Sequence, residues 1–225
     1  MAQEPADSIA TDSVTTDKHD PAEYLSGSLP VLYINTDGEK EIVSKEVYLK
    51  GTYYLDAMGI EGYENIGSAE TPLALQIKGR GNTTWKFDKK PYRLKFDKKA
   101  APLGMNKSKH FVLLANCEHN SLSLYKDVLG FWLSRQLGLK WTPAIKPVEL
   151  VINGDYRGLY NLAEQVRVDP DRVNVVEQED GETDPDLVTG GWLVEIDNYT
   201  EVGQVLIQSK KDGRHIRFTP KTPEE

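Results

Sequence analysis

Short stretches of the chain alternate apolar and polar residues with a period of two or form compact apolar runs, a pattern that predicts β-strands. The runs lie at 29–36, 41–57, 73–79, 110–116, 147–166, 190–199 and 206–219. Asn153-Gly154 divides one of them into two strands joined by a tight turn, and Asp212-Gly213 does the same in the last run. The pattern predicts a mainly antiparallel sheet.

One segment, residues 121–138, has the periodicity of a helix. Its large apolar residues recur at three- and four-residue intervals, Ser121 is a suitable N-cap and Gly138 a suitable stop. We expect the resulting stripe to pack into the core rather than to bind a cofactor. Its members are Leu122, Tyr125, Leu129, Trp132, Leu133 and Leu137. The fold class expected is therefore α+β, an antiparallel sheet with a bracing helix.

The N-terminal end differs in composition from the rest of the chain. Residues 1–28 are rich in Asp, Glu, Ser, Thr and Ala and nearly lack large apolar groups, so they are expected to form a disordered acidic tether. The remaining residues, 29–225, are enough for one domain with a sizeable core.

Residues 77–96 carry the clearest chemical signal. Gly79 and Gly81 bracket Arg80, and a basic segment follows, with seven Lys or Arg and two Asp in residues 86–99. Glycine allows the backbone to approach a ligand closely, and backbone amides together with cations suit a phosphate or carboxylate. Two interpretations stay open here: an anion cradle, or a β-hairpin with a solvated, lysine-rich face.

Overall charge and residue usage narrow the function classes. The chain has a formal net charge of −8 and a sequence pI near 5.1, which argues against nucleic acid as a partner. A local basic stretch on an acidic protein fits a small anionic ligand better. The single cysteine, Cys117, and four scattered histidines provide no metal-ligand spacing.

Other sequence signals bear on location and on the acidic residues. No window approaches the roughly 20 apolar residues of a membrane span, and no signal peptide is present. The opening AQEPADSIATDS fits the start of a mature exported chain whose signal peptide has been removed, so we expect a location outside the cytoplasm, in the cell envelope or secreted. The alternative is a cytoplasmic location. Asp169 and Asp171 flank a proline, where a turn is favoured over a metal site.

Seven motifs in order resemble one known family. They are RGNTTW, KKPYRLKF, LLAN, LSRQLG, VINGDYRGLYNLAEQV, DRVNV and GGWLVEID, spread over roughly residues 29–200. In this order the chain resembles the CotH family of spore-coat-type protein kinases, in its Bacteroidetes-type version. The resemblance implies an atypical kinase fold that uses ATP and Mg²⁺ to phosphorylate serines of partner proteins. The identity of the protein substrate does not follow from the sequence.

The resemblance also implies positions for the nucleotide. Residues 29–163 would form the small lobe, and 164–225 the hinge and the start of a second lobe. Residues of the glycine turn and the basic strand would contact the phosphates, and hinge backbone groups would contact adenine. The implied nucleotide-binding residues are Gly79, Arg80, Gly81, Asn82, Lys90, Arg93, Lys95, Glu164, Gln165 and Val166.

The chain departs from the family pattern near its C-terminal end. The family's metal-binding aspartate lies in a Trp-Asp-x-Asp-like motif, whereas Trp192 is followed by Leu193 and no other Trp-Asp pair exists. No catalytic or metal-binding residue is therefore assigned, and the chain is expected to be incomplete for catalysis. The alternative is a non-catalytic binding or scaffold module on the cell surface. A weaker third possibility is binding of an acidic polymer or glycan to the basic strand.

Overall fold

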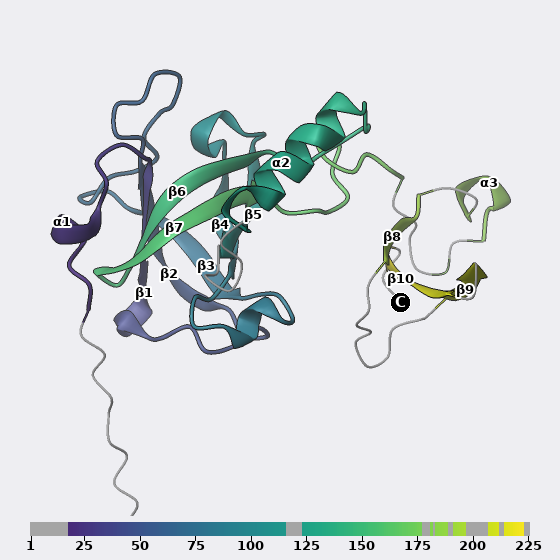
Figure 1. Cartoon of the computed structure of the whole chain (residues 1–225), viewed down its shortest axis with the longest axis horizontal. Coiled ribbons are helices and arrows are strands. Elements are labelled where there is room, and N and C mark those ends of the chain that lie inside the picture. The colour runs from purple at the N-terminus through teal and green to yellow at the C-terminus, as the bar shows by residue number, and fades with distance from the viewer. Residues whose placement is uncertain are drawn as a thin grey trace, which may run out of the picture.

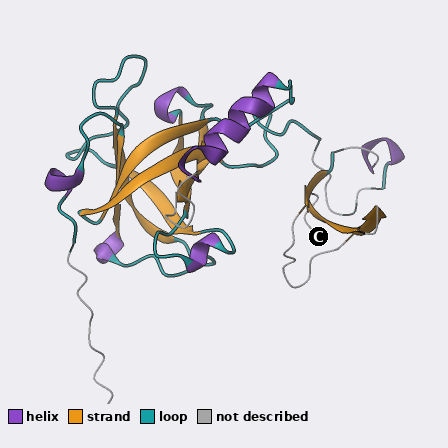
Figure 2. Ribbon diagram, viewed as in Figure 1, coloured by secondary structure: helices purple, strands orange, loops and turns teal. Residues whose placement is uncertain are grey.

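A closed β-barrel of seven strands forms the body of the protein in a computed structural model (Figures 1 and 2). The structure describes residues 18–115, 123–176, 181, 183–188, 191–196, 207–211 and 214–222. The barrel strands are β1 (Val31–Thr36), β2 (Leu49–Asp56), β3 (Leu73–Gly79), β4 (Tyr92–Ala100), β5 (Ser108–Ala115), β6 (Ile145–Ile152) and β7 (Asp155–Glu164). Their order around the barrel is β1-β2-β3-β4-β5-β7-β6.

One parallel pairing closes the barrel. Neighbouring strands are otherwise antiparallel, but β1 runs parallel to β6, with Val31 opposite Glu149 and Ile34 opposite Ile152. Closure leaves no strand edge open to solvent on the barrel. The fold is therefore mixed rather than purely antiparallel.

The core fills the inside of the barrel. Alternate residues of each strand point inward, as the period of two requires, and Tyr53 stacks on Phe96 with ring centroids 4.1 Å apart. The inward side chains that are almost fully buried include Leu32, Ile34, Tyr53, Leu55, Ile77, Leu94, Phe96, Phe111, Leu113, Leu150, Tyr160 and Leu162. This packed interior leaves the outer faces of the strands and the two barrel ends as places for a site.

The remaining elements are short apart from one helix. They are the helices α1 (Pro21–Tyr24), α2 (Ser123–Gln136) and α3 (Pro185–Val188), and the 3-10 turns η1 (Asp37–Glu39), η2 (Thr84–Lys86) and η3 (Pro102–Gly104). A separate three-stranded sheet has the order β8-β10-β9, from β8 (Leu193–Ile196), β9 (Ile207–Lys211) and β10 (Arg214–Thr222). No helix in the described part of the chain is long and apolar enough to cross a membrane.

The expected α+β fold, a kinase-like small lobe with a bracing helix, is wrong. The described chain is mostly β, with a closed barrel and one helix longer than four residues, α2, which has 14. Sequence patterns missed the closure because β1 and β6 are separated by more than 100 residues, and no local signal specifies such a pairing. The strands were predicted, but their arrangement was not.

The orientation of α2 also differs from the prediction. The expected core stripe is exposed at every described position, namely Tyr125, Leu129, Trp132, Leu133 and Leu137. Val128 and Phe131, on the other side of the helix, are half-buried instead. Because α2 is apolar on both sides, periodicity indicated a helix but could not identify which side faces the protein.

The structure confirms one predicted turn and shortens one predicted strand. The Asn153-Gly154 turn joins β6 to β7, and both residues have positive φ, 52° and 73°. Strand β2 begins at Leu49, so the strand expected over 41–57 is shorter than predicted. Asp212-Gly213 lies outside the described residues, but β9 and β10 on either side of it pair as an antiparallel hairpin.

The N-terminal segment contacts the barrel along its described part. Lys18 Nζ donates to Asn153 O at 2.8 Å, and His19 N donates to Asp155 Oδ1 at 2.8 Å, both on the β6–β7 hairpin. Glu149 accepts hydrogen bonds from Ser26 N and Ser26 Oγ. Of the expected tether, residues 18–28 are thus held on the barrel surface, and residues 1–17 lie outside the described residues.

Candidate functional site

The glycine turn that follows β3 is shaped by packing. Gly79 N donates to Ser44 O at 2.8 Å, and Arg80 N donates to Pro91 O at 3.1 Å. A Cβ on Gly79 would lie 2.4 Å from the Trp85 ring, and Gly81 has a φ of 83°. The amides of Gly79 and Arg80 are therefore used within the chain, and Gly79 makes room for Trp85. Asn82 follows in the same turn and is exposed.

Lys90 belongs to the end of the barrel rather than to the outer face of β4. Its Nζ donates to Trp85 O at 3.0 Å and lies 5.5 Å from the centroid of the Trp85 ring. The same side chains line a cavity of about 420 Å³ together with Asp88, Asp155 and other residues of both charge signs. The acidic side chains in its lining make this cavity a poor fit for a phosphate.

Arg93 and Lys95 point away from the core on β4, two residues apart on one face. Lys95 lies opposite His110 of β5 in the strand register. Burial, together with the charges of Arg167, Lys95, Arg172 and Arg93 in decreasing order of effect, lowers the pKa of His110 to about 4. These cations therefore converge on one imidazole, which stays neutral at pH 7.

We call this surface the cationic face, and it consists of Arg80, Arg93, Lys95, His110 and Arg167. Arg80 joins it through Arg93: burial lowers the pKa of Arg80, the charge of Arg93 lowers it further, and Asp127 of α2 and Glu195 of β8 raise it. Charges from three separate elements thus act on Arg80, namely Arg93 of β4, Asp127 of α2 and Glu195 of β8. The sequence indicated no partner for Arg80 because these elements are distant along the chain.

The segment predicted to be the hinge lies at the end of β7. Glu164 is buried, and its carboxylate accepts hydrogen bonds from Asn106 N at 3.3 Å and Ala144 N at 2.9 Å. Its own amide donates to Ala144 O, and Gln165 O accepts from Arg172 Nη1 at 2.7 Å. Val166 is exposed. Contact of these residues with adenine stays a prediction.

The strand register relates the two predicted parts of the nucleotide site. Gly79 is level with Leu162, and Glu164 lies two residues further along β7. Three strand spacings of roughly 4.8 Å separate β3 from β7. The glycine turn and the end of β7 therefore flank the outer face of β4 and β5, with Arg93 and Lys95 between them.

Arg172 lies beside the inward-facing core residue Phe111, and residue-by-residue prediction missed its effect on His110. It is 3% exposed, and its guanidinium lies 5.4 Å from the centroid of the Phe111 ring. Burial lowers its pKa, whereas Glu164 and Asp169 raise it. The only available signal was its place in the motif DRVNV, which indicates no function on its own.

The cationic face fits an anion. Arg93 is half-buried, and its Nε has no hydrogen-bond partner among the residues that the structure describes. A buried guanidinium N–H favours an acceptor such as a phosphate oxygen. For a metal ion the fit is poorer, because the described residues contain no group of three His, Cys, Asp or Glu side chains that could hold one.

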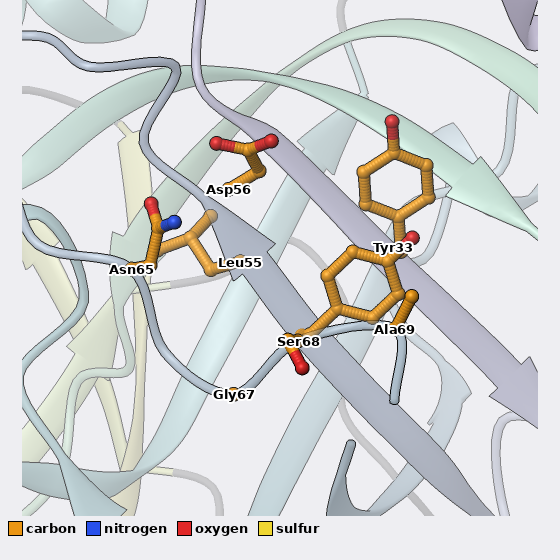
Figure 3. Close-up of a pocket in the computed structure, with 8 residues that line it drawn as sticks. Tyr33, Leu55, Asp56, Asn65, Gly67, Ser68 and Ala69 are labelled. Atoms are coloured by element: carbon orange, nitrogen blue, oxygen red, sulfur yellow. The ribbon is translucent and has the colours of Figure 1, made fainter. Parts of the chain in front are cut away.

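A second cavity, of about 240 Å³, has the opposite character. It lies on the outer side of β1 and β2, and it is lined by Tyr33, Asp56, Asn65 and Ser68 among others (Figure 3). Tyr33 stacks on Tyr54 with centroids 4.4 Å apart. Burial and then the charges of Asp56 and Glu149 raise the pKa of Tyr33. The carboxylate of Asp56 in the lining makes this pocket a poor fit for a phosphate.

Comparison with known proteins agrees with the motifs. The family model described as CotH kinase protein matches residues 77–213, more than half of the chain. The match begins in β3, just before the glycine turn, and includes β4, α2, β7, all five residues of the cationic face and Arg172. No curated protein matches the chain.

Proposed function

The chain belongs to the CotH kinase protein family, and on this premise we propose that the cationic face binds the triphosphate of ATP. The observation that carries the proposal is the convergence of Arg93, Lys95 and Arg167 on His110, whose pKa burial and these charges lower to about 4. Like charges held close together repel one another, and a bound polyanion relieves that repulsion. The chain as a whole has a formal net charge of −8, so a local group of cations contrasts with an otherwise acidic protein.

The arrangement of the cations favours a chain of phosphates over a single one. Arg93 and Lys95 lie two residues apart on one strand, about 7 Å at the usual rise per residue. Arg80 extends the row beyond Arg93 at the β3 end. A guanidinium can contact two phosphate oxygens at once, while the lysine ammonium acts as a point charge.

The reaction supported by the family is transfer of the γ-phosphoryl group to a serine of a partner protein. The bond from the γ-phosphorus to the bridging oxygen of ADP breaks, a bond to the seryl oxygen forms, and the hydroxyl proton is released. Catalysis of this step depends largely on positioning the phosphates and stabilising their charge, which the cationic face would supply. Mg²⁺ would accompany the ATP. The carboxylates whose charges raise the pKa of Arg80 are those of Asp127 and Glu195.

Nucleotide binding is tested by the shift in melting temperature on adding ATP and Mg²⁺. Arg93→Ala with Lys95→Ala is expected to abolish the shift, because both cations on the outer face of β4 are removed. Lys98→Ala with Lys99→Ala is the matched control: it removes the same number of charges from exposed positions of the same strand and is expected to retain the shift. Equal shifts in the two double variants would refute the proposal.

A second candidate function is a binding or scaffold module that keeps the fold without the chemistry. The absence of a three-residue metal cluster among the described residues favours it. The two functions are separated by incubating the full chain with γ-labelled ATP, Mg²⁺ and a serine-containing protein. Label transfer to serine supports the kinase, and nucleotide binding without transfer supports the module.

A further inference from the structure

Helix α2 exposes a large apolar row of side chains. We define the α2 stripe as Tyr125, Leu129, Trp132, Leu133 and Leu137, whose exposures range from 48% for Leu133 to 73% for Tyr125. Exposed apolar patches of this kind mark interaction sites in soluble proteins. The opposite side of the helix, which includes Val128 and Phe131, is half-buried. Helix α2 therefore has two apolar sides: the side with Val128 and Phe131 is partly buried, and the side with the α2 stripe is exposed.

We propose that the α2 stripe pairs with the α2 stripe of a second copy of this chain to form a two-fold symmetric dimer. Four of its members, Tyr125, Leu129, Leu133 and Leu137, are spaced by four residues and form one ridge along the helix. Ridges of this kind interdigitate in the commonest class of helix crossing. The same ridge on a second copy supplies a matching surface.

The ridge is also suited to a two-fold axis. Its four positions are symmetric about position 131, so it presents large apolar side chains in the same spacing when its direction is reversed. An isologous interface requires this self-complementarity, because the same patch serves both copies. Asp127 and Arg135 lie away from the stripe, whereas Lys126 lies between Leu133 and Leu137 on the helix surface. The aliphatic part of a lysine can pack against apolar neighbours while its ammonium stays in water at the rim of an interface.

The exposed area is large enough for a stable dimer. The stripe offers roughly 430 Å² of apolar surface per copy, taking about 200 Å² for a fully exposed aromatic side chain and about 100 Å² for a leucine. About 60% of a typical interface is non-polar, so the corresponding interface would bury roughly 1,400 Å² in total. Specific interfaces usually bury about 1,200–2,000 Å².

The test is the mass of the full chain in solution, measured by light scattering over a range of concentrations without nucleotide. The expected result is a plateau at about twice the chain mass of 25.3 kDa. Leu129→Glu with Leu133→Glu is expected to give the monomer mass, with at least a tenfold weaker association. Because both side chains are about half exposed or more, the substitution removes little packing, and the far-ultraviolet circular dichroism spectrum is expected to be unchanged.

Val47→Glu is the matched control, since it replaces an apolar side chain that is 62% exposed outside the stripe, and the dimer is expected to persist. A monomer at every concentration would overturn the proposal. A mass that grows beyond the dimer would also overturn it, because contacts between unlike patches do not close. Retention of the dimer by the Leu129→Glu and Leu133→Glu variant would overturn it as well.

Discussion

Replacing Gly79 by alanine tests whether this glycine serves the packing of the turn after β3. The added Cβ would lie 2.4, 2.5 and 2.8 Å from three carbons of the Trp85 ring, closer than Cβ atoms approach other atoms in proteins. The ring must therefore move, although it packs against the barrel core and the backbone carbonyl of Trp85 is held by a hydrogen bond from Lys90 Nζ. The clash is one of side-chain volume, since Gly79 does not have a positive φ.

The magnitude follows from the cost of overpacking. Inserting one carbon into a filled site costs about 1–3 kcal/mol, and in a chain of this length each kcal/mol lowers the melting temperature by roughly 2–4 °C. We expect the melting temperature of Gly79→Ala to fall by about 2–12 °C, measured by thermal denaturation followed by circular dichroism. The same substitution in a Trp85→Ala background is expected to cost less than a third as much.

The double-mutant comparison isolates the contact between the two residues. Trp85→Ala alone destabilises the chain by lost packing, but it creates the space that the new methyl group needs. Equal losses of stability for Gly79→Ala in the two backgrounds would refute the packing argument. The requirement for glycine at position 79 would then come from the backbone conformation and not from the space taken by the Trp85 ring.

The remaining predictions concern a buried carboxylate and a histidine. Glu149→Ala is expected to lower the free energy of unfolding by about 1–3 kcal/mol in a denaturant titration, because Ser26 N and Tyr156 Oη lose their acceptor. The control is Glu39→Ala at an exposed ion pair, which is expected to change stability by less than about 0.5 kcal/mol. Equal effects of the two substitutions would contradict this prediction. In the Glu149→Ala variant the Tyr156 pKa, which burial and Glu149 raise to about 12, is expected to fall in a spectrophotometric titration. His110 is expected to titrate by NMR near pH 4 rather than 6.5, because burial and the surrounding cations disfavour its charged form. Since the unfolded chain then binds the proton at higher pH, the free energy of unfolding is expected to decline as the pH falls from about 6.5 to 4. A midpoint near 6.5 would contradict both the burial of His110 and the effect of the cations.

The sequence was a good guide to the fold where a local rule decides the structure. Asn153-Gly154 predicts a tight hairpin because both positions need positive φ, and the structure has that turn. Residues 73–79 and 110–116 were predicted as strands from their β-branched and apolar residues and are β3 and β5 to within two residues. These elements depend on neighbours in sequence.

The rest depends on contacts between distant residues. Parallel pairing of Val31 with Glu149 closes the barrel, and nothing near either residue encodes it. The side of α2 that packs inward could not be determined, since Phe131 and Leu129 are both large and apolar but only Leu129 is exposed. Long-range register thus decided the fold class.

The candidate site shows the same division. Arg93 and Lys95 were predicted to share a face because they are two residues apart on one strand, and the structure places both on the outer side of β4. Their convergence with Arg167 and Arg172 on His110 needed the register of β4 with β5 and the path of the chain after β7. Lys90 looked equivalent in sequence but lies against Trp85 at the barrel end.

The most direct test of the cationic face is the pKa of His110 measured by NMR in the full chain, with and without ATP and Mg²⁺. A triphosphate bound among Arg93, Lys95 and Arg167 would bring negative charge next to the imidazole and favour its protonated form. The predicted result is a pKa near 4 in the absence of nucleotide and a clear rise at saturating ATP. Saturable binding of ATP with no change in the His110 pKa would place the nucleotide elsewhere and contradict the account.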